Sequence, residues 1–456
     1  MRIPGPLLLW REVVDRAARQ SPARLALSVF AAVIGVFTAL LLTPQATASG
    51  RQAPFVDALF TATSAVCVTG LTTVPTGTYW STFGQVVILV GIKVGGLGVM
   101  TLASLLGLAV SRRIGLTQKI LAASETRSAR LGEVGSLLRV VIITATALEV
   151  SIALVLFPRF LVLGEPLGVA AWHGVFYAVS AFNNAGFVPT AEGLAPYTSD
   201  WWIGAPIALG VFVGSLGFPA ILTIARHRRR FRRWSLHTKL TVVTSAALAV
   251  TGTVLVGAIE WGNPATFGRL DVPGRLLAAV FAGVMPRSGG FATIDVGQMH
   301  ESSWLITDAL MFVGGGSAST AGGIKVTTLA VMLLAILAEA RGDRDVEAFG
   351  RRIPRETLRL AVAVVFIGAT TVLVASLLVL EITGLPLDVV LFEVLSAFAT
   401  VGLSTGITPD LPDEAKYVLS ALMFVGRTGT MTVAAALALR DRRRVIRYPE
   451  ERPIIG

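Results

Sequence analysis

Long apolar runs are the feature of this sequence that most constrains its fold. Eight runs approach the ~20 residues that an α-helix needs to cross the hydrocarbon core of a bilayer. They cover residues 25–42, 83–110, 140–163, 202–224, 240–259, 304–337, 360–380 and 417–439. Because 54% of all residues are hydrophobic and only 15% are charged, the composition also fits a membrane protein better than a soluble enzyme. The sequence therefore predicts an all-α polytopic membrane protein with eight transmembrane spans.

The positions of the basic residues predict the orientation of these spans. Most of the 39 Lys and Arg residues lie in the two termini and in three alternate connections, 112–130, 226–239 and 341–359. This asymmetry matches the positive-inside rule, so we expect a multi-pass protein of the plasma (inner) membrane with both termini in the cytoplasm. The net charge of +11 is then explained by contacts with the lipid membrane rather than with nucleic acid. The basic run at 226–234 is interpreted as an anchor near anionic lipid, with a docking patch for a partner as the alternative.

Between successive pairs of spans lies an apolar segment that is too short to cross the membrane again. The four segments are FVDALFTATSAVCVTGL (55–71), GVFYAVSAFNNAGF (174–187), LLAAVFAGVMPRSGGF (276–291) and LFEVLSAFATVGL (391–403). Each has helical length and ends in a glycine followed by a bulky apolar residue, at Gly70, Gly186, Gly290 and Gly402. Each segment therefore predicts a half-helix followed by a stretch of extended backbone.

A second motif has the same register. Val-Gly pairs that end at Gly95, Gly214, Gly314 and Gly426 follow the four glycines by 24 to 28 residues. Because every copy contains an even number of spans, two, the copies are parallel and can surround one axis. We predict four M1-P-M2 repeats, each a long helix, a pore half-helix and a second long helix. Their expected bounds are 25–110, 136–226, 238–338 and 357–440, with a cytoplasmic amphipathic N-terminus at 1–24 and a cytoplasmic tail at 441–456.

Four non-helical segments around one axis predict an ion pathway. At membrane depth, irregular backbone is tolerated only where it is buried in protein or lines a watery cavity. A ring of backbone carbonyls can replace the hydration shell of a cation. The alternative is that the glycines only allow close helix packing, but four copies at one position favour a filter.

Several of these stretches resemble motifs of the Trk/Ktr/HKT superfamily of potassium transporters and channels. They are DALFTATSAVCVTGL, SAFNNAGF, PRSGGF, SAFATVGLST and GGGSASTAGGIKVTT, and the resemblance covers residues 25–440. The short segment before the first span is closer to the Ktr type than to the longer Trk type. The resemblance implies a homodimer with one pore in each subunit. Glycine at all four filter positions implies a preference for potassium, with some permeation of sodium or rubidium left open.

The resemblance and the repeat together define the candidate filter, in which backbone carbonyls would hold K⁺. It consists of Val66, Cys67, Val68, Thr69, Gly70, Asn183, Asn184, Ala185, Gly186, Ser288, Gly289, Gly290, Thr400, Val401 and Gly402.

The stretch MFVGGGSASTAGGIKVTT (311–328) predicts a gate. Its small residues remove side-chain packing where the other long helices carry V-G-x-x-G, except that Ser317 replaces the second glycine. We expect an intramembrane loop over 314–325 that obstructs the ion pathway until a cytosolic partner protein pulls on the helix below it. The alternative is a helix kink that has no part in gating. The candidate gate residues are Gly314, Gly315, Gly316, Ser317, Ala318, Ser319, Thr320, Ala321, Gly322, Gly323, Lys325 and Arg427.

Charged side chains at membrane depth are costly unless they are paired, hydrated or face a cavity. We expect Arg287 to support the filter by pairing with Glu393, or failing that with Asp57; the alternative is that it only reaches the outer interface. Arg427 is expected below the pore, as an electrostatic barrier or as a structural tie. Lys93 receives no role, with an acid across the dimer or the inner cavity as possible surroundings.

The predicted function is potassium uptake by a channel, passive or stimulated by sodium as an activator. The chain has no phosphate-cradling loop and no residues for a covalent cofactor, so any nucleotide acts through a partner. The resemblance implies that this partner is a cytosolic ring of RCK domains (KtrA-like). A secondary active cation symporter with alternating access is the rival reading. An enzyme is not predicted, because no nucleophile, base and orienting group fall at one depth.

Overall fold

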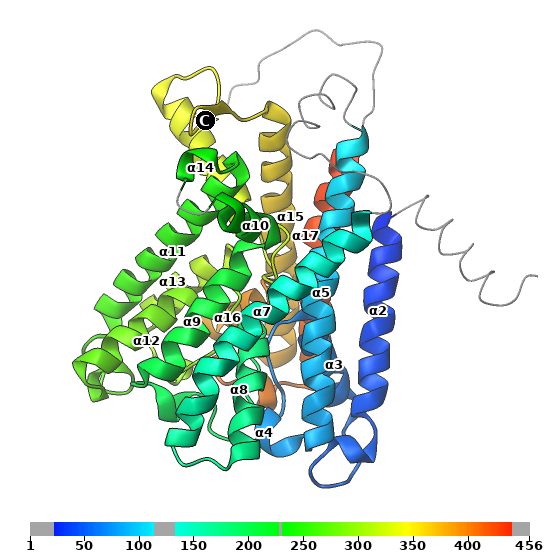
Figure 1. Cartoon of the computed structure of the whole chain (residues 1–456), viewed down its shortest axis with the longest axis vertical. Coiled ribbons are helices and arrows are strands. Elements are labelled where there is room, and N and C mark those ends of the chain that lie inside the picture. The colour runs from blue at the N-terminus through cyan, green and yellow to red at the C-terminus, as the bar shows by residue number, and fades with distance from the viewer. Residues whose placement is uncertain (1–21, 114–132, 228–229, 440–456) are drawn as a thin grey trace, which may run out of the picture.

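The computed structural model describes residues 22–113, 133–227 and 230–439. Figure 1 shows the long helices packed together, some along the vertical axis and others oblique to it. The expected N-terminal segment, the tail at 441–456 and most of the basic connection at 112–130 lie outside the described residues.

Six of the eight predicted spans correspond to unbroken helices. These are α2 (Pro22–Leu41), α5 (Thr82–Arg113), α7 (Glu133–Val162), α11 (Leu236–Glu260), α15 (Arg355–Thr383) and α17 (Asp413–Leu439). Within the described residues, Arg139–Val162 of α7, α11 and α15 are long and apolar enough to cross a membrane, and α9 with α10 would add a fourth. The total of eight spans stays a prediction.

The two remaining spans are broken helices. The stretch 304–337 forms α13 (Glu301–Phe312) and α14 (Val326–Arg341), separated by the 313–325 loop. The stretch 202–224 forms α9 (Trp201–Leu216) and α10 (Phe218–His227), which meet at Gly217 with a bend of 101°. We predicted a span there and did not expect the bend, so whether the pair crosses the membrane as one span stays a prediction. The physical reason for the bend is tertiary, because the 313–325 loop binds the backbone on both sides of Gly217: Gly316 N donates to Ser215 O (2.7 Å) and Phe218 N donates to Ala318 O (3.2 Å).

Four short apolar helices fall between the long ones. They are α3 (Phe55–Cys67), α8 (Leu167–Phe182), α12 (Val272–Val284) and α16 (Leu387–Phe398). Pro54, Pro166 and Pro386 precede α3, α8 and α16, while Asp271 caps α12 by accepting from Gly274 N. Proline suits the start of a helix because the first N–H groups have no partner within the helix.

The contacts between helices close into a circle in chain order. Each short helix packs within its own unit, and the second long helix of each unit also contacts the next short helix: α5 contacts α8, α9 contacts α12, α13 contacts α16, and α17 returns to α3. The C-terminal ends of the four short helices therefore lie among neighbours from two successive units.

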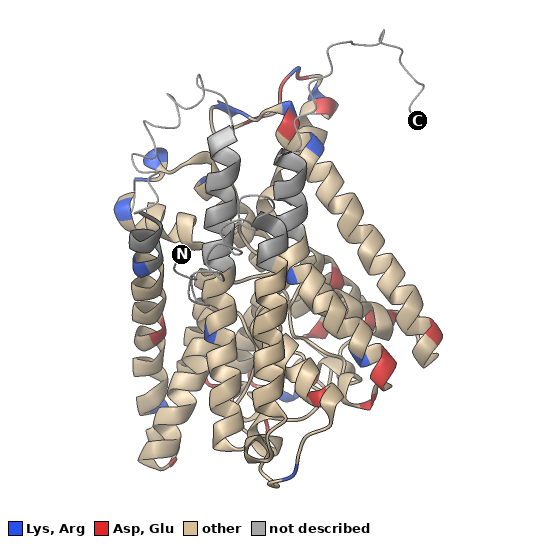
Figure 2. Cartoon of the chain, turned by 90° about the vertical axis from the view of Figure 1, so that its right-hand side faces the viewer, with Lys and Arg blue, Asp and Glu red and all other residues tan. Residues whose placement is uncertain are grey.

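The rest of the described chain is small. A helical turn, α4 (Thr76–Tyr79), precedes α5, and 3-10 turns lie in the connections. Strands β1 (Glu347–Ala348) and β2 (Arg351–Arg352) form an antiparallel hairpin in the connection between α14 and α15, so the described chain is not strictly all-α. Figure 2 shows most charged residues near the two ends of the long helices and few along their middle, as expected for helices surrounded by lipid.

Candidate functional site

The four segments that follow the short helices meet at their glycines. We call them the first, second, third and fourth glycine segments, ending at Gly70, Gly186, Gly290 and Gly402. A Cβ added at Gly70 would overlap the carbonyl oxygen of Ala185, and one at Gly186 would lie 2.9 Å from the Cα of Gly290. A Cβ at Gly290 would overlap Val401 O, and one at Gly402 would overlap Thr69 O. Each segment thus borders the next, and the fourth borders the first, so the four segments form a closed ring that we call the glycine ring.

The same backbone conformation recurs in all four segments. The φ angles of the four glycines are 100°, 70°, 70° and 97°. Two positions earlier, Val68, Asn184, Ser288 and Thr400 have φ angles of 57°, 60°, 68° and 48°. A left-handed residue other than glycine costs about 1–3 kcal/mol, and β-branched Val and Thr are particularly unusual there. Because this strain recurs at four equivalent positions, all four segments require the same left-handed backbone conformation there.

Backbone hydrogen bonds show which way these peptide groups point. The residue before each glycine donates its N–H back to its own short helix: Thr69 to Ser64 O, Ala185 to Ser180 O and Val401 to Ser396 O, each at 2.8 Å. In the third segment Gly289 N donates to Met285 O, also at 2.8 Å. In a trans peptide the carbonyl points opposite to the N–H. The carbonyls of the four left-handed residues therefore point away from the short helices.

Serine hydroxyls add a second tie in two segments. Ser64 Oγ accepts from Gly70 N (3.0 Å), and Ser396 Oγ accepts from Gly402 N (3.1 Å). By the same trans geometry, the carbonyls of Thr69 and Val401 also point away from the short helices. The only functional groups that the ring offers a cation in all four segments are backbone carbonyl oxygens.

The Val-Gly motif serves the close approach of the long helices. A Cβ at Gly95, Gly214 or Gly426 would overlap the carbonyl oxygen of Val66, Phe182 or Phe398, respectively. Each of these oxygens lies four residues before a segment glycine. In the remaining copy, a Cβ at Gly314 would overlap Gly322 O of the 313–325 loop.

The 313–325 loop is held along its whole length by hydrogen bonds. Its two ends run together, because Gly314 N donates to Ile324 O (2.8 Å) and Val326 N donates to Gly315 O (3.0 Å). Its central residues, Ser319 and Thr320, are buried. The loop is therefore an ordered part of the fold.

The loop contacts the second and third glycine segments directly. Thr320 Oγ1 donates to the Oδ1 atom of Asn184 (2.7 Å). Gly322 N donates to Ser288 Oγ (3.2 Å), and the same hydroxyl donates to Thr400 O (2.6 Å). The loop and the glycine ring are thus one hydrogen-bonded unit.

Two cations bind carbonyl oxygens of the loop. Lys325 Nζ donates to Ala321 O at 2.7 Å. Arg427 from α17 is 1% exposed, and its Nη1 donates to Thr320 O. Nε and Nη2 of Arg427 have no hydrogen-bond partner within the described ranges. Both charges lie against the loop, and their role in gating stays a prediction.

The prediction that Arg287 pairs with Glu393 or Asp57 was wrong. Its guanidinium is buried and donates from Nη1 to Ser245 O (2.8 Å) and from Nη2 to Ser245 Oγ (2.9 Å), on α11. Glu393 instead accepts from Ser404, Thr405 and Thr408, which follow the fourth segment. Asp57 lies 4.0 Å from Lys416 Nζ. Neither carboxylate bonds the guanidinium, because the third segment lies against the first helix of its own unit.

Sequence reasoning missed Glu149. This carboxylate lies inside the apolar run of α7 and is 5% exposed. It forms an ion pair with Lys93 of α5 and accepts from Asn183 Nδ2 at 2.8 Å. Lys93 thus has its acid within the same chain, not across a dimer. One acid within an apolar run was the available signal.

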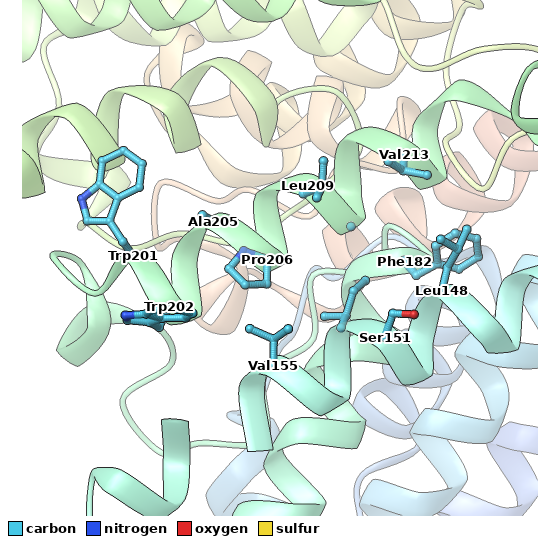
Figure 3. A pocket seen from close by; sticks show the side chains of 12 residues that line it. Leu148, Ser151, Val155, Phe182, Trp201, Trp202, Ala205, Pro206, Leu209 and Val213 are labelled. Atoms are coloured by element: carbon cyan, nitrogen blue, oxygen red, sulfur yellow. The ribbon is translucent and has the colours of Figure 1, made fainter. Parts of the chain in front are cut away.

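An apolar groove of about 600 Å³ runs between α7 and α9 (Figure 3). Trp202 and Val155 line it near one end, and Phe182 and Val213 near the other. The hydroxyl of Ser151, which also lines it, donates to Ala147 O of its own helix. The groove offers a cation no ligands comparable with those of the glycine ring.

The apolar helical bundle is typical of a membrane protein, and the family to which the chain belongs makes it a transport protein and not an enzyme. The chain belongs to the TrkH family of cation transport proteins, whose model matches residues 15–443.

Curated relatives match almost the entire chain. It is 36% identical to the Ktr system potassium uptake protein B of Bacillus subtilis over 455 residues, which cover 99% of this chain and 100% of the relative. It is 34% identical to the potassium/sodium uptake protein NtpJ of Enterococcus hirae, over 96% of this chain and 98% of the relative. The crystal structure of the potassium transporter TrkH from Vibrio parahaemolyticus has a TM-score of 0.72 at 16% identity, covering 90% of this chain and 83% of that one. At this identity, the likeness to the TrkH structure shows the fold alone.

Proposed function

We propose that this protein takes up potassium across the cell membrane through a filter made of the four glycine segments. The observation that carries the proposal is the repeated backbone geometry. In all four segments a left-handed residue precedes the glycine by two positions, and the intervening N–H bonds back to the short helix. Their carbonyl oxygens can then replace the water around a dehydrated cation, although Thr400 O also accepts from Ser288 Oγ.

The choice of ion is supported by relatives. The Bacillus subtilis relative is named for potassium uptake and the Enterococcus hirae relative for potassium and sodium uptake. Potassium is therefore the proposed cargo, and sodium is proposed as an activator. Glycine at all four positions keeps side chains out of the ring.

The 313–325 loop is proposed as the gate. It joins the glycine ring through Asn184 and Ser288, and Arg427 donates a hydrogen bond to its backbone at Thr320 O. The gate opens when the loop leaves these partners. A cytosolic ring of RCK domains that binds nucleotide is proposed to pull on α14 or α10, and the working unit is proposed to be a homodimer with cytoplasmic termini.

The filter is tested by potassium uptake and by sodium competition in a strain that lacks its own potassium transporters. Gly70→Ser and Gly290→Ser should reduce potassium uptake or admit sodium, because a side chain at either position meets the next segment. Gly164→Ser is the matched control: Gly164 has a φ of 93°, but a Cβ there meets nothing within 4 Å. Equal uptake and sodium rejection by all four proteins would refute the filter.

A symporter with alternating access is the second candidate. Asp308 favours it, because this carboxylate is buried within α13 and its Oδ1 atom has no hydrogen-bond partner in the part of the chain that the structure describes. Carriers use such intramembrane acids to bind coupling ions. Single-channel recording from reconstituted protein separates the two. Discrete potassium currents support a pore, whereas their absence together with coupled uptake supports the carrier.

A further inference from the structure

The ion pair between Lys93 and Glu149 connects helices of two different units. Lys93 lies on α5 and Glu149 on α7, and their side chains are 25% and 6% exposed, respectively. Taking two charges out of water costs energy that their attraction does not always offset. Such a pair is therefore a poor way to gain stability and a good way to fix a geometry.

The geometry that the pair fixes belongs to the second glycine segment. Asn183 is fully buried and is the C-terminal cap of α8. Its Nδ2 atom donates to Glu149 Oε1 and to Val179 O, both at 2.8 Å. The carboxylate thus holds the side chain of the residue that begins the second segment.

α5 is shaped to receive this arrangement. A Cβ at Gly96 would overlap the Oδ1 atom of Asn183, and a Cβ at Gly95 would overlap Val66 O in the last turn of α3, next to the first segment. Lys93 is on the same turn of α5 as these two glycines. One turn of α5 therefore lies against both the first and the second segments and supplies the charge that orients Glu149.

The neighbouring residue extends the network to the loop. Asn184 Nδ2 donates to Val211 O on α9 (3.1 Å), while its Oδ1 accepts from Thr320 (2.7 Å). The second segment is thus tied outward through Asn183 to the ion pair and through Asn184 to the 313–325 loop.

The third segment has a comparable tie without an ion pair. At the position equivalent to Asn183, Arg287 bonds to Ser245 on α11, the first long helix of its unit. Cys67 and Ala399 occupy the same position in the first and fourth segments, with side chains too short for such a bond. The outward tie is therefore present in two neighbouring segments of the ring.

We propose that Glu149, whose buried charge Lys93 balances, is a positioning residue that sets the ion selectivity of the second glycine segment. It acts through the Asn183 amide and touches no transported ion. The proposal rests on the filter proposed above. A rigid ring cannot contract around the smaller sodium ion, whereas a segment without its tie can.

Glu149→Ala removes the tie and leaves Lys93 unpaired. We expect the potassium-to-sodium permeability ratio in proteoliposomes to fall roughly tenfold, as when partners that orient metal ligands are lost. In the double variant Lys93→Met/Glu149→Gln, the side-chain oxygen at position 149 can still accept from Asn183, and no buried charge is left without a partner. The ratio of this variant should stay within about twofold of the wild type, since the coupled changes compensate. Ser151→Ala, on the groove side of α7, is the control.

If Glu149→Ala does not fold, Asn183→Ala removes the same tie from its other end and should lower the ratio likewise. The proposal is overturned if the folded variant, Glu149→Ala or Asn183→Ala, has the potassium-to-sodium permeability ratio of the wild type. It is also overturned if the double variant Lys93→Met/Glu149→Gln loses as much selectivity as Glu149→Ala. Gly70→Ser is measured alongside. If Gly70→Ser also leaves the ratio unchanged, the filter itself fails; if only the Glu149 variants leave it unchanged, the positioning role alone fails.

Discussion

The two broken helices of this protein differ in a way that explains each of them. Between α9 and α10 the chain turns by 101° at Gly217 alone. Between α13 and α14 it opens into the 313–325 loop. The first break provides hydrogen-bond partners for the second, because Ser215 O and Phe218 N, on either side of Gly217, bond to the loop. A break of one residue thus supplies backbone partners that an intact helix would keep for itself.

The loop is held both by backbone groups and by side chains. Its partners include Ser215 O, Phe218 N and its own two ends. Among the side-chain bonds, Arg427 and Lys325 donate to loop carbonyls, and Asn184 Oδ1 accepts from Thr320. Breaking either set tests whether the loop closes the pathway.

The largest effect is expected when the loop itself is shortened. Deleting residues 316–321 removes the bonds to Ser215, Asn184 and Arg427 together. We expect potassium flux into proteoliposomes to rise by more than about tenfold, because several bonds of roughly 1 kcal/mol each are lost. Flux equal to that of the wild type, in a deletion protein that still rejects sodium, would show that the loop is not the barrier.

A smaller rise is expected for Arg427→Ala. Its bond to Thr320 O is charge-assisted and buried, so its loss should shift the gate by about 1.5 kcal/mol, or roughly tenfold in flux. Arg427→Lys keeps the charge and alters the bond geometry. If potassium flux rises in Arg427→Ala but not in Arg427→Lys, the charge acts as an electrostatic barrier. If flux rises in both variants, the arginine acts by holding the loop. A lower or unchanged flux in folded Arg427→Ala contradicts both roles in closing the gate.

The smallest effect is expected at the elbow. Gly217 has φ 86° and ψ 150°, a region that is essentially restricted to glycine, and an added Cβ would lie 2.5 Å from Ser317 O. Gly217→Ala should therefore displace the loop and raise flux by roughly threefold, at a cost of about 1–3 kcal/mol in stability.

Gly342→Ala is the control for the elbow. Gly342 also has a positive φ, 74°, but a Cβ there meets nothing within 4 Å. Thermal unfolding and flux are measured together. If both variants lower the melting temperature but neither raises flux, then the contact between the elbow and the loop has no part in gating.

Much of this architecture was predictable, because long apolar runs and repeated glycines act locally. An apolar run of membrane length can satisfy its backbone in lipid only as a helix. The segment glycines were found from their spacing, and the break over 314–325 was found from its glycine and serine content. The roles of these residues in filtering and gating still await the experiments above.

Other features could not be predicted. Arg287 was expected beside Glu393 but lies against Ser245, 42 positions earlier in the chain. The bend at Gly217 was missed, since one glycine in an apolar run is common in membrane helices. Glu149 was overlooked because its partners, Lys93 and Asn183, lie on two other helices.

The sequence by itself determined where this chain is helical, where its backbone must be free of side chains, and which charges would be expensive in a membrane. These follow from local composition and from the cost of unsatisfied polar groups in lipid. Only the tertiary structure decided which partner each buried charge has and which backbone groups the 313–325 loop binds. Those choices depend on which segments become neighbours when the four units close into a ring, and no local pattern encodes that proximity.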